Sequence, residues 1–126
     1  MKSVGSVREN LDTEKRISVT LETAKKFINL KFNIFLQKDY AKHLGIKDEE
    51  YEKIGVTLLS SEKEVLEKSD IILSVNCPSE GITNLIKSKS ILIGQFDPFS
   101  NNKEIINKLI SNNIKIFSLN LLQSIL

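Results

Sequence analysis

Six short runs of apolar residues alternate with amphipathic helical patterns along almost the whole chain. Several of these runs are apolar at consecutive positions, which is typical of strands covered on both faces of a sheet. Because repeated strand–helix units give parallel strands with right-handed crossovers, we predict an α/β fold. The predicted architecture is an open, mostly parallel sheet of about five or six strands, with helices on both faces. The predicted strands are residues 3–7, 33–36, 56–59, 71–75, 91–93 and 114–119.

Capping residues mark where the intervening helices begin. Ser61 and Glu64 have the spacing of a capping box, and Gly55 is suited to end a short helix. The predicted helix starts are Thr20, Asp48, Ser61, Ser79 and Asn101 or Asn102. The side chains predicted to face inward are Leu21, Ala24, Phe27, Ile28, Tyr51, Ile54, Val65, Leu66, Ile82, Leu85, Ile86, Ile105, Ile106, Leu109 and Ile110.

Composition and charge exclude several classes of function. The 18 Lys and Arg are mixed with 16 Asp and Glu, and the net charge of +2 gives no basis for binding nucleic acid or an anionic membrane. No apolar run approaches the roughly 20 residues of a membrane helix, so we expect no membrane insertion. The single cysteine, Cys77, excludes an internal disulfide and fits a reducing compartment. We therefore expect a soluble, cytoplasmic protein.

The connection between the first predicted strand and the first predicted helix is long and highly charged. Residues 8–20 read RENLDTEKRISVT, whereas strand-to-helix loops typically run about 2 to 6 residues. A long connection at the carboxyl end of a strand is where α/β proteins place ligand contacts. We therefore expect ligand-binding residues in this segment.

Three segments of the chain, taken in order, resemble the N-terminal domains of alanine dehydrogenases and of the soluble alpha subunits of NAD(P) transhydrogenases. The first lies in the charged connection, the second is DIILSVNCPS at residues 70–79, and the third is ILIGQFDPFSNNKEIINKL at residues 91–109. In the first segment the matching residues are Arg8, Glu9, Glu14, Arg16, Val19 and Thr20. The resemblance covers nearly the whole chain and implies a Rossmann-like or flavodoxin-like N-terminal domain.

Within this resemblance, Arg16 is the strongest candidate for binding a ligand. The matching arginine of alanine dehydrogenases holds the substrate carboxylate, and a guanidinium suits that task because it donates two parallel hydrogen bonds. The alternative is that Arg16 pairs with Glu9 or Glu14 and orders the connection. Arg8 and Glu9 are further candidates for the cleft; they either position the connection or form a solvent-exposed pair.

Further candidates lie where the later strands end. Asn76 stands where alanine dehydrogenases usually have a substrate-binding Lys, and Asp97 stands where they have a catalytic His. The missing His argues against alanine chemistry, because its pKa suits proton transfer near neutrality. We expect Asn76, Gln95 and Asp97 to face the ligand cleft at the carboxyl edge of the sheet. For Asn76 and Asp97, the alternative is a turn beside the proline that follows.

The remaining reactive residues give no catalytic or metal site. We expect Cys77 to be a small buried group rather than a nucleophile, and His43 to be a surface residue. One His without a set of Cys or His ligands cannot form a zinc site. Neither a GxGxxG nor a GxxxxGK[ST] segment occurs, so we expect no dinucleotide-binding turn in this chain.

The resemblance implies that residues 1–126 are an incomplete N-terminal domain, without the NAD-binding domain, of a transhydrogenase alpha subunit. In the complete protein a hydride would move between NAD(H) and NADP(H), coupled to proton translocation. The implied partners are the remainder of the alpha subunit, a membrane subunit and an NADP-binding beta subunit, in a dimer at the cytoplasmic side of the inner membrane. We expect the chain alone to be inactive and to hold no cofactor. The alternatives are a fragment of an alanine dehydrogenase-like oxidoreductase and a stand-alone flavodoxin-like binding module.

Overall fold

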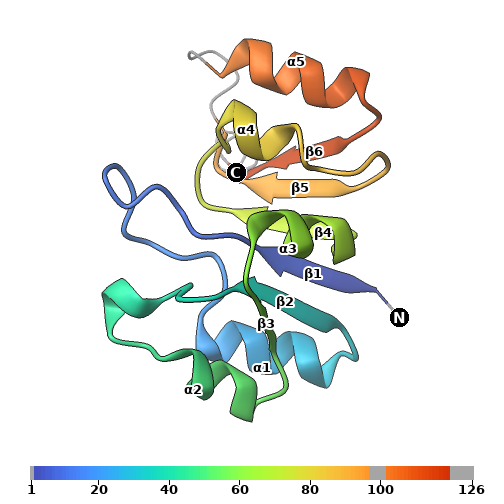
Figure 1. Ribbon diagram of the computed structural model, residues 1–126. Coiled ribbons are helices and arrows are strands. Elements are labelled where there is room, and N and C mark those ends of the chain that lie inside the picture. The colour runs from blue at the N-terminus through green and yellow to red at the C-terminus, as the bar shows by residue number, and fades with distance from the viewer. Residues whose placement is uncertain (1, 97–101, 120–126) are drawn as a thin grey trace.

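The computed structural model describes residues 2–96 and 102–119, which form an α/β domain around a single sheet (Figure 1). Every strand pairs in parallel with its neighbours, and the strand order is β3-β2-β1-β4-β5-β6. The strands are β1 (Ser3–Ser6), β2 (Asn33–Gln37), β3 (Thr57–Leu59), β4 (Ile71–Ser74), β5 (Ile91–Gly94) and β6 (Lys115–Ser118). The predicted fold class is confirmed, and each predicted strand is present within a residue of its expected ends.

The helices also follow the predicted order. They are α1 (Leu21–Asn29), the 3-10 turn η1 (Lys42–Leu44), α2 (Asp48–Lys53), α3 (Glu62–Lys68), α4 (Glu80–Thr83) and α5 (Lys103–Ser111). The hydroxyl groups of Thr20 and Ser61 accept from backbone N–H groups in the first turns of α1 and α3, as predicted. Ser79 precedes α4 but makes no side-chain cap; its backbone carbonyl accepts from the N–H groups of Ile82 and Thr83.

Two apolar clusters cover the opposite faces of the sheet. Because side chains alternate along a strand, Ile34 and Leu36 of β2 join the cluster under α1 and α2, whereas Phe35 packs with the cluster under α3, α4 and α5. Helix α3 approaches the central strand so closely that a Cβ on Gly5 would lie 1.8 Å from the Ser69 hydroxyl oxygen. This arrangement confirms helices on both faces.

One predicted core residue of α5 faces solvent instead. Leu109 is buried, but Ile110 is 58% exposed. Helix α5 packs on β6, the edge strand of the described sheet, and on α4, and Ile110 lies on a side of the helix that these contacts leave exposed. The prediction for Ile110 was therefore wrong, because the sequence pattern shows an apolar stripe but not how much of it the sheet can cover.

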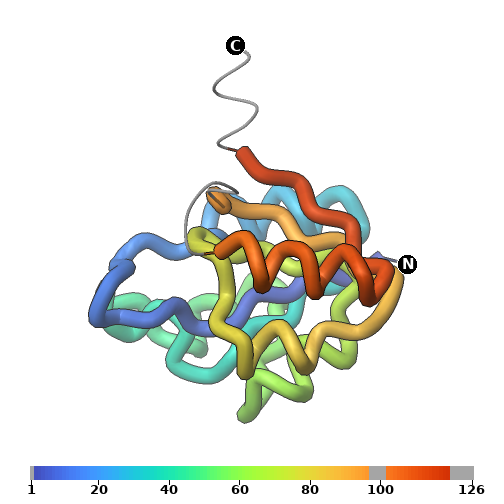
Figure 2. Tube along the Cα trace, turned by 90° about the horizontal axis from the view of Figure 1, so that it is seen from above, coloured from blue at the N-terminus to red at the C-terminus, as the bar shows by residue number. Residues whose placement is uncertain are grey.

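The strand order also determines where a ligand can bind. β1 and β4 are neighbours at the centre of the sheet, and the chain extends the sheet in opposite directions from them. In open parallel sheets, the connections leaving such a pair diverge and create a crevice at the carboxyl ends of the strands. Figure 2 shows the connection after β1 reaching far out to one side of the sheet. Asp97 and Asn101 lie outside the described residues.

Candidate functional site

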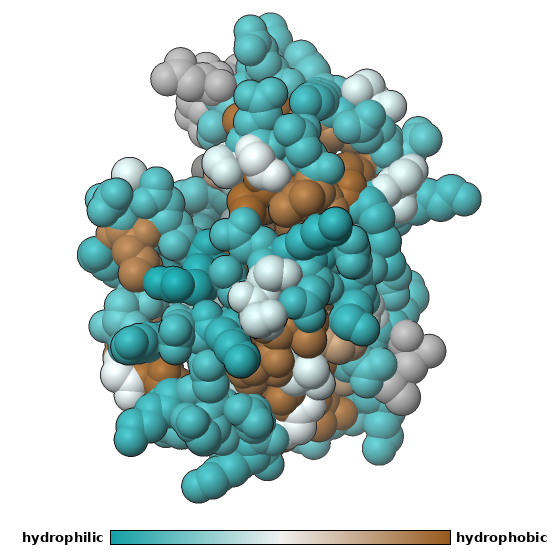
Figure 3. All heavy atoms as spheres, in the orientation of Figure 1, coloured by the Kyte–Doolittle hydropathy of each residue, from teal (hydrophilic) through white to brown (hydrophobic). Residues whose placement is uncertain are grey.

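A cleft of about 600 Å³ opens where the connections after β1 and β4 diverge. One wall is formed by residues 7–10, 13 and 14 and the other by residues 74, 76–79, 81 and 82, with Gln37 and Glu62 completing the lining. In the space-filling view, hydrophilic side chains dominate this face of the molecule, and apolar groups appear only in patches (Figure 3). The cleft lining itself carries carboxylate, amide and hydroxyl groups beside apolar Val7 and Ile82, so it is suited to a ligand with hydrogen-bonding groups.

Glu9 joins the two walls. Its carboxylate accepts hydrogen bonds from the backbone N–H groups of Val75 at 3.0 Å and Asn76 at 3.4 Å, at the end of β4. Burial raises the pKa of Glu9, and the two backbone hydrogen bonds oppose that rise. Glu9 thus fixes the connection after β1 against the connection after β4.

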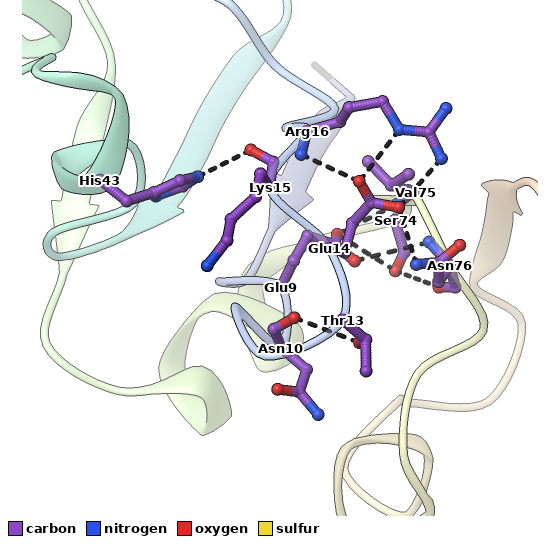
Figure 4. A network of polar contacts seen from close by, with 10 residues as sticks. All are labelled: Glu9, Asn10, Thr13, Glu14, Lys15, Arg16, His43, Ser74, Val75 and Asn76. Carbon is purple, nitrogen blue, oxygen red and sulfur yellow. Dashed lines mark hydrogen bonds and ion pairs between the residues drawn. The ribbon is translucent and has the colours of Figure 1, made fainter.

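Glu14 lies at the centre of the polar network, between Arg16 and Asn76 (Figure 4). One carboxylate oxygen accepts from the backbone N–H and the Nε of Arg16, and the other accepts from a terminal nitrogen of Arg16 and from Asn76 Nδ2, all at 2.9 Å. These Arg16 hydrogen bonds lower the pKa of Glu14 to about 2. Glu14 is 8% exposed and is ionised throughout the physiological pH range.

Two buried tyrosines anchor the far end of the charged connection. The Ser6 hydroxyl donates to the Leu73 carbonyl, so the Tyr40 hydroxyl is the donor in the 2.8 Å bond between Tyr40 and Ser6. The Tyr40 oxygen in turn accepts from the backbone N–H groups of Ser18 and Val19, at 3.2 Å each. Burial raises the pKa of Tyr40 to about 12, so the hydroxyl keeps its proton.

Tyr51 and His43 hold two further carbonyl groups of this connection. The Tyr51 hydroxyl donates to the Val19 carbonyl at 2.8 Å, and its ring packs edge-on against that of Tyr40. His43 Nε2 lies 2.8 Å from the carbonyl oxygen of Lys15 (Figure 4). The connection is therefore fixed at both ends, although it has no helix or strand of its own.

The candidate residues from the first two segments meet at this site. Arg8, Glu9 and Asn76 line the cleft, and Arg16 joins the group through Glu14. Arg8 and Glu9 form no ion pair with each other: Arg8 is exposed, and its backbone N–H donates to the side chain of Gln37 at 2.8 Å. The Asn76 amide nitrogen donates to Glu14, and no described residue donates to its Oδ1, so the Asx turn considered for Asn76 does not form.

The candidates that follow β5 are less closely connected to the cleft. The backbone N–H of Gln95 donates to the Val75 carbonyl at 3.0 Å, but Gln95 does not line the cleft. Asp97 lies outside the described residues. Cys77 lines the cleft and is half-buried, and burial raises the pKa of its thiol, which disfavours a thiolate nucleophile.

Sequence reasoning gave Glu14 only as a possible partner of Arg16, a pairing that the structure shows, and did not identify Tyr40 as a site residue. The two-residue spacing of Glu14 and Arg16 was the available signal, since an acidic residue so close to a ligand-binding arginine competes for its donors. Nothing in the sequence near Tyr40 indicates that its hydroxyl reaches back to residues 18 and 19. Among the described residues, no group of His, Cys, Asp and Glu side chains is arranged to hold a metal ion.

The chain matches a known protein family and known relatives. Residues 5–125 match the family model described as alanine dehydrogenase/PNT, N-terminal domain. The chain is 29% identical over 106 residues to the first part of the NAD(P) transhydrogenase alpha subunit of Rickettsia prowazekii, covering 79% of this chain and 27% of that protein. It is 27% identical over 89 residues to alanine dehydrogenase of Methanococcus maripaludis, covering 71% of this chain and 24% of that protein.

A solved structure of transhydrogenase from Sinorhizobium meliloti has the same fold, with a TM-score of 0.88 and 26% identity. The match covers 95% of this chain and 35% of the transhydrogenase chain. The chain thus spans about a quarter of the length of the curated relatives it matches. Within residues 2–96 and 102–119, no helix has the length and apolar character needed to span a membrane.

Proposed function

Because the chain belongs to the family of alanine dehydrogenase/PNT N-terminal domains, we propose that it is the N-terminal domain of the soluble alpha subunit of an NAD(P) transhydrogenase. The observation that carries this proposal is the similarity to a transhydrogenase over 95% of the chain at 26% identity. In the complete protein a hydride passes between NAD(H) and NADP(H), and membrane subunits couple this transfer to proton translocation. This domain contributes one wall of the NAD cleft.

The cleft between the connections after β1 and β4 supports that role. It is lined by carboxylate, amide and hydroxyl groups at the edge of the sheet where ligands of open α/β folds bind. The chain has no Gly-rich dinucleotide-binding turn. We therefore expect this wall to contact polar groups of the dinucleotide other than its pyrophosphate. We assign Arg8, Glu9 and Asn76 of the cleft lining to this wall. Arg16, Gln95 and Asp97 remain candidate ligand residues of the complete domain.

The remaining components follow from the same proposal. The NAD-binding domain belongs to the remainder of the alpha subunit, and the NADP site belongs to a beta subunit. The complete protein is a dimer on the cytoplasmic side of the inner membrane, held there by a membrane subunit. This chain by itself binds no cofactor and is not catalytic.

An alanine dehydrogenase-like function is the second candidate, favoured by the similarity to the Methanococcus maripaludis enzyme. Two residues of this chain oppose it: Asn76 replaces the substrate-binding Lys, and Asp97 replaces the catalytic His. The carboxylate-binding role of Arg16 is also weakened, because Glu14 already accepts two parallel hydrogen bonds from its guanidinium.

A calorimetric titration with NADH tests the proposal. We compare three proteins: the chain alone, the NAD-binding domain of a transhydrogenase alpha subunit, and a fusion of the two. The fusion is expected to bind NADH more tightly than the domain alone, and Asn76→Ala is expected to weaken that binding. Glu22→Gln is the matched control, because Glu22 is an exposed residue of α1. Micromolar binding by the chain alone, or no gain in the fusion, would contradict the proposal.

A further inference from the structure

The hydrogen bonds around Glu14 use the full acceptor capacity of its carboxylate. Each oxygen accepts two hydrogen bonds, three of the four coming from Arg16 and one from Asn76 Nδ2. A carboxylate has about four lone-pair positions, so Glu14 has none left for a ligand. Its influence on a ligand therefore acts through the groups it holds, Arg16 and Asn76.

Asn76 is oriented by this contact. Because Glu14 is ionised, it can only accept, so the amide nitrogen of Asn76 must face it and the amide oxygen must point elsewhere. The backbone N–H of Asn76 donates to Glu9 and its backbone carbonyl accepts from the Ser74 hydroxyl at 2.6 Å. Among the described residues, Oδ1 has no partner, and Asn76 lines the cleft. Asn76 therefore offers the cleft an acceptor and at most one N–H.

The charges at this end of the cleft also oppose an anion. Glu14 compensates the positive charge of Arg16. The Arg16 side chain is 63% exposed, so water screens its remaining charge. Glu9 and Glu62 line the same cleft and outnumber Arg8, the one cation of its lining, and none of the three forms an ion pair among the described residues. A ligand carboxylate would meet these negative groups and the lone pairs of Asn76 Oδ1.

We propose that Glu14 sets the ligand preference of this cleft, making its Asn76 end a site for a neutral hydrogen-bond donor, above all a primary carboxamide, and excluding small carboxylates. A carboxamide matches both groups that Asn76 presents, because it donates to Oδ1 and accepts from the remaining N–H. A carboxylate can only accept, so it leaves Oδ1 unpaired. Glu14 is a positioning residue here, because it acts through Asn76 and Arg16. The inference rests on the proposed function only in taking the cleft as a ligand site.

The test compares lactamide with lactate, which differ only in carrying an amide or a carboxylate. Each is titrated into the full 126-residue chain, and the side-chain NH₂ signal of Asn76 is followed by NMR. Lactamide is expected to bind at least about tenfold more tightly than lactate, the factor typical of one unpaired polar contact. In Glu14→Gln, the affinity for lactate is expected to rise about tenfold. The substitution removes the negative charge that compensates Arg16, so the cleft becomes less negative. Glu22→Gln, which removes an exposed carboxylate of α1, should leave both affinities unchanged.

Three outcomes would overturn the inference. These are tighter binding of lactate than lactamide to the unsubstituted chain, no saturable shift with either ligand, and an unchanged ratio of affinities in Glu14→Gln. The comparison in the unsubstituted chain decides the matter even if Glu14→Gln does not fold. The readout is independent of NADH binding and hydride transfer, so its failure is distinguishable from failure of the transhydrogenase proposal.

Discussion

Tyr40→Phe is expected to be much more destabilising than the same change at its neighbour Tyr51. Both tyrosines are buried and their rings pack against each other, so the two substitutions remove one hydroxyl each from nearly the same environment. They differ in hydrogen bonding. The Tyr40 hydroxyl donates to Ser6 and accepts from two backbone N–H groups, whereas Tyr51 makes a single bond to the Val19 carbonyl.

The expected losses in the free energy of unfolding follow from the polar groups that each substitution leaves without a hydrogen-bond partner. Each buried polar group without a partner costs about 1–3 kcal/mol. Tyr40→Phe leaves the N–H groups of Ser18 and Val19 without their acceptor, and Val19 is fully buried. We therefore expect a loss of about 2–4 kcal/mol in the free energy of unfolding, against about 1–2 kcal/mol for Tyr51→Phe.

Urea unfolding followed by circular dichroism measures both losses, and hydrogen exchange at residues 18 and 19 shows where the effect arises. Tyr40→Phe should speed exchange at both amides, whereas Tyr51→Phe should not. Equal losses for the two variants, or a larger loss for Tyr51→Phe, would show that the ring packing and not the hydroxyl of Tyr40 anchors the charged connection.

Two further predictions concern acid stability and backbone packing. The pKa of Glu14 is lowered from 4.5 to about 2 by Arg16, so its contribution to stability is present above pH 4.5 and is lost as the pH falls toward 2. The pKa of Glu9 is raised, so Glu9 contributes stability at low pH instead. That contribution is lost as the pH rises above 4.5. Urea unfolding should therefore show a smaller loss between about pH 5 and pH 3 for Glu14→Gln than for the unsubstituted chain, and an equal loss would refute the pairing. Gly5→Ala should destabilise the fold by about 1–3 kcal/mol, because its Cβ would overlap the Ser69 side chain. Thermal melting of Gly5→Ala and of the double variant with Ser69→Gly, which should recover part of the loss, checks this; an unchanged melting temperature would refute it.

The fold was largely predictable from the sequence because its elements are set by local patterns. Apolar runs indicated all six strands, and Thr20 and Ser61 indicated helix starts that the hydroxyl caps confirm. Ile110 shows the limit of this reasoning. Its place on an apolar stripe is a property of the helix alone, but its exposure depends on α5 lying at the edge of the sheet.

The site was only partly predictable, because its contacts join residues far apart in the sequence. The carboxyl edge of the sheet brings Glu9 and Asn76 together as the predicted topology requires. The central position of Glu14 is not visible in the sequence, since it depends on the connection folding back so that one carboxylate reaches both Arg16 and Asn76. The reach of Tyr40 to residues 18 and 19 is likewise a tertiary contact without a local pattern.

The most direct test of the transhydrogenase proposal is a hydride-transfer assay on a chimera. Residues 5–119 replace the matching segment of a transhydrogenase alpha subunit, which is then assembled with its membrane and beta subunits. The account predicts transfer from NADPH to an NAD analogue, with a marked loss in Asn76→Ala and none in Glu22→Gln. A folded, assembled chimera that transfers no hydride between the nucleotides, or that instead reduces NAD with alanine, would contradict the account.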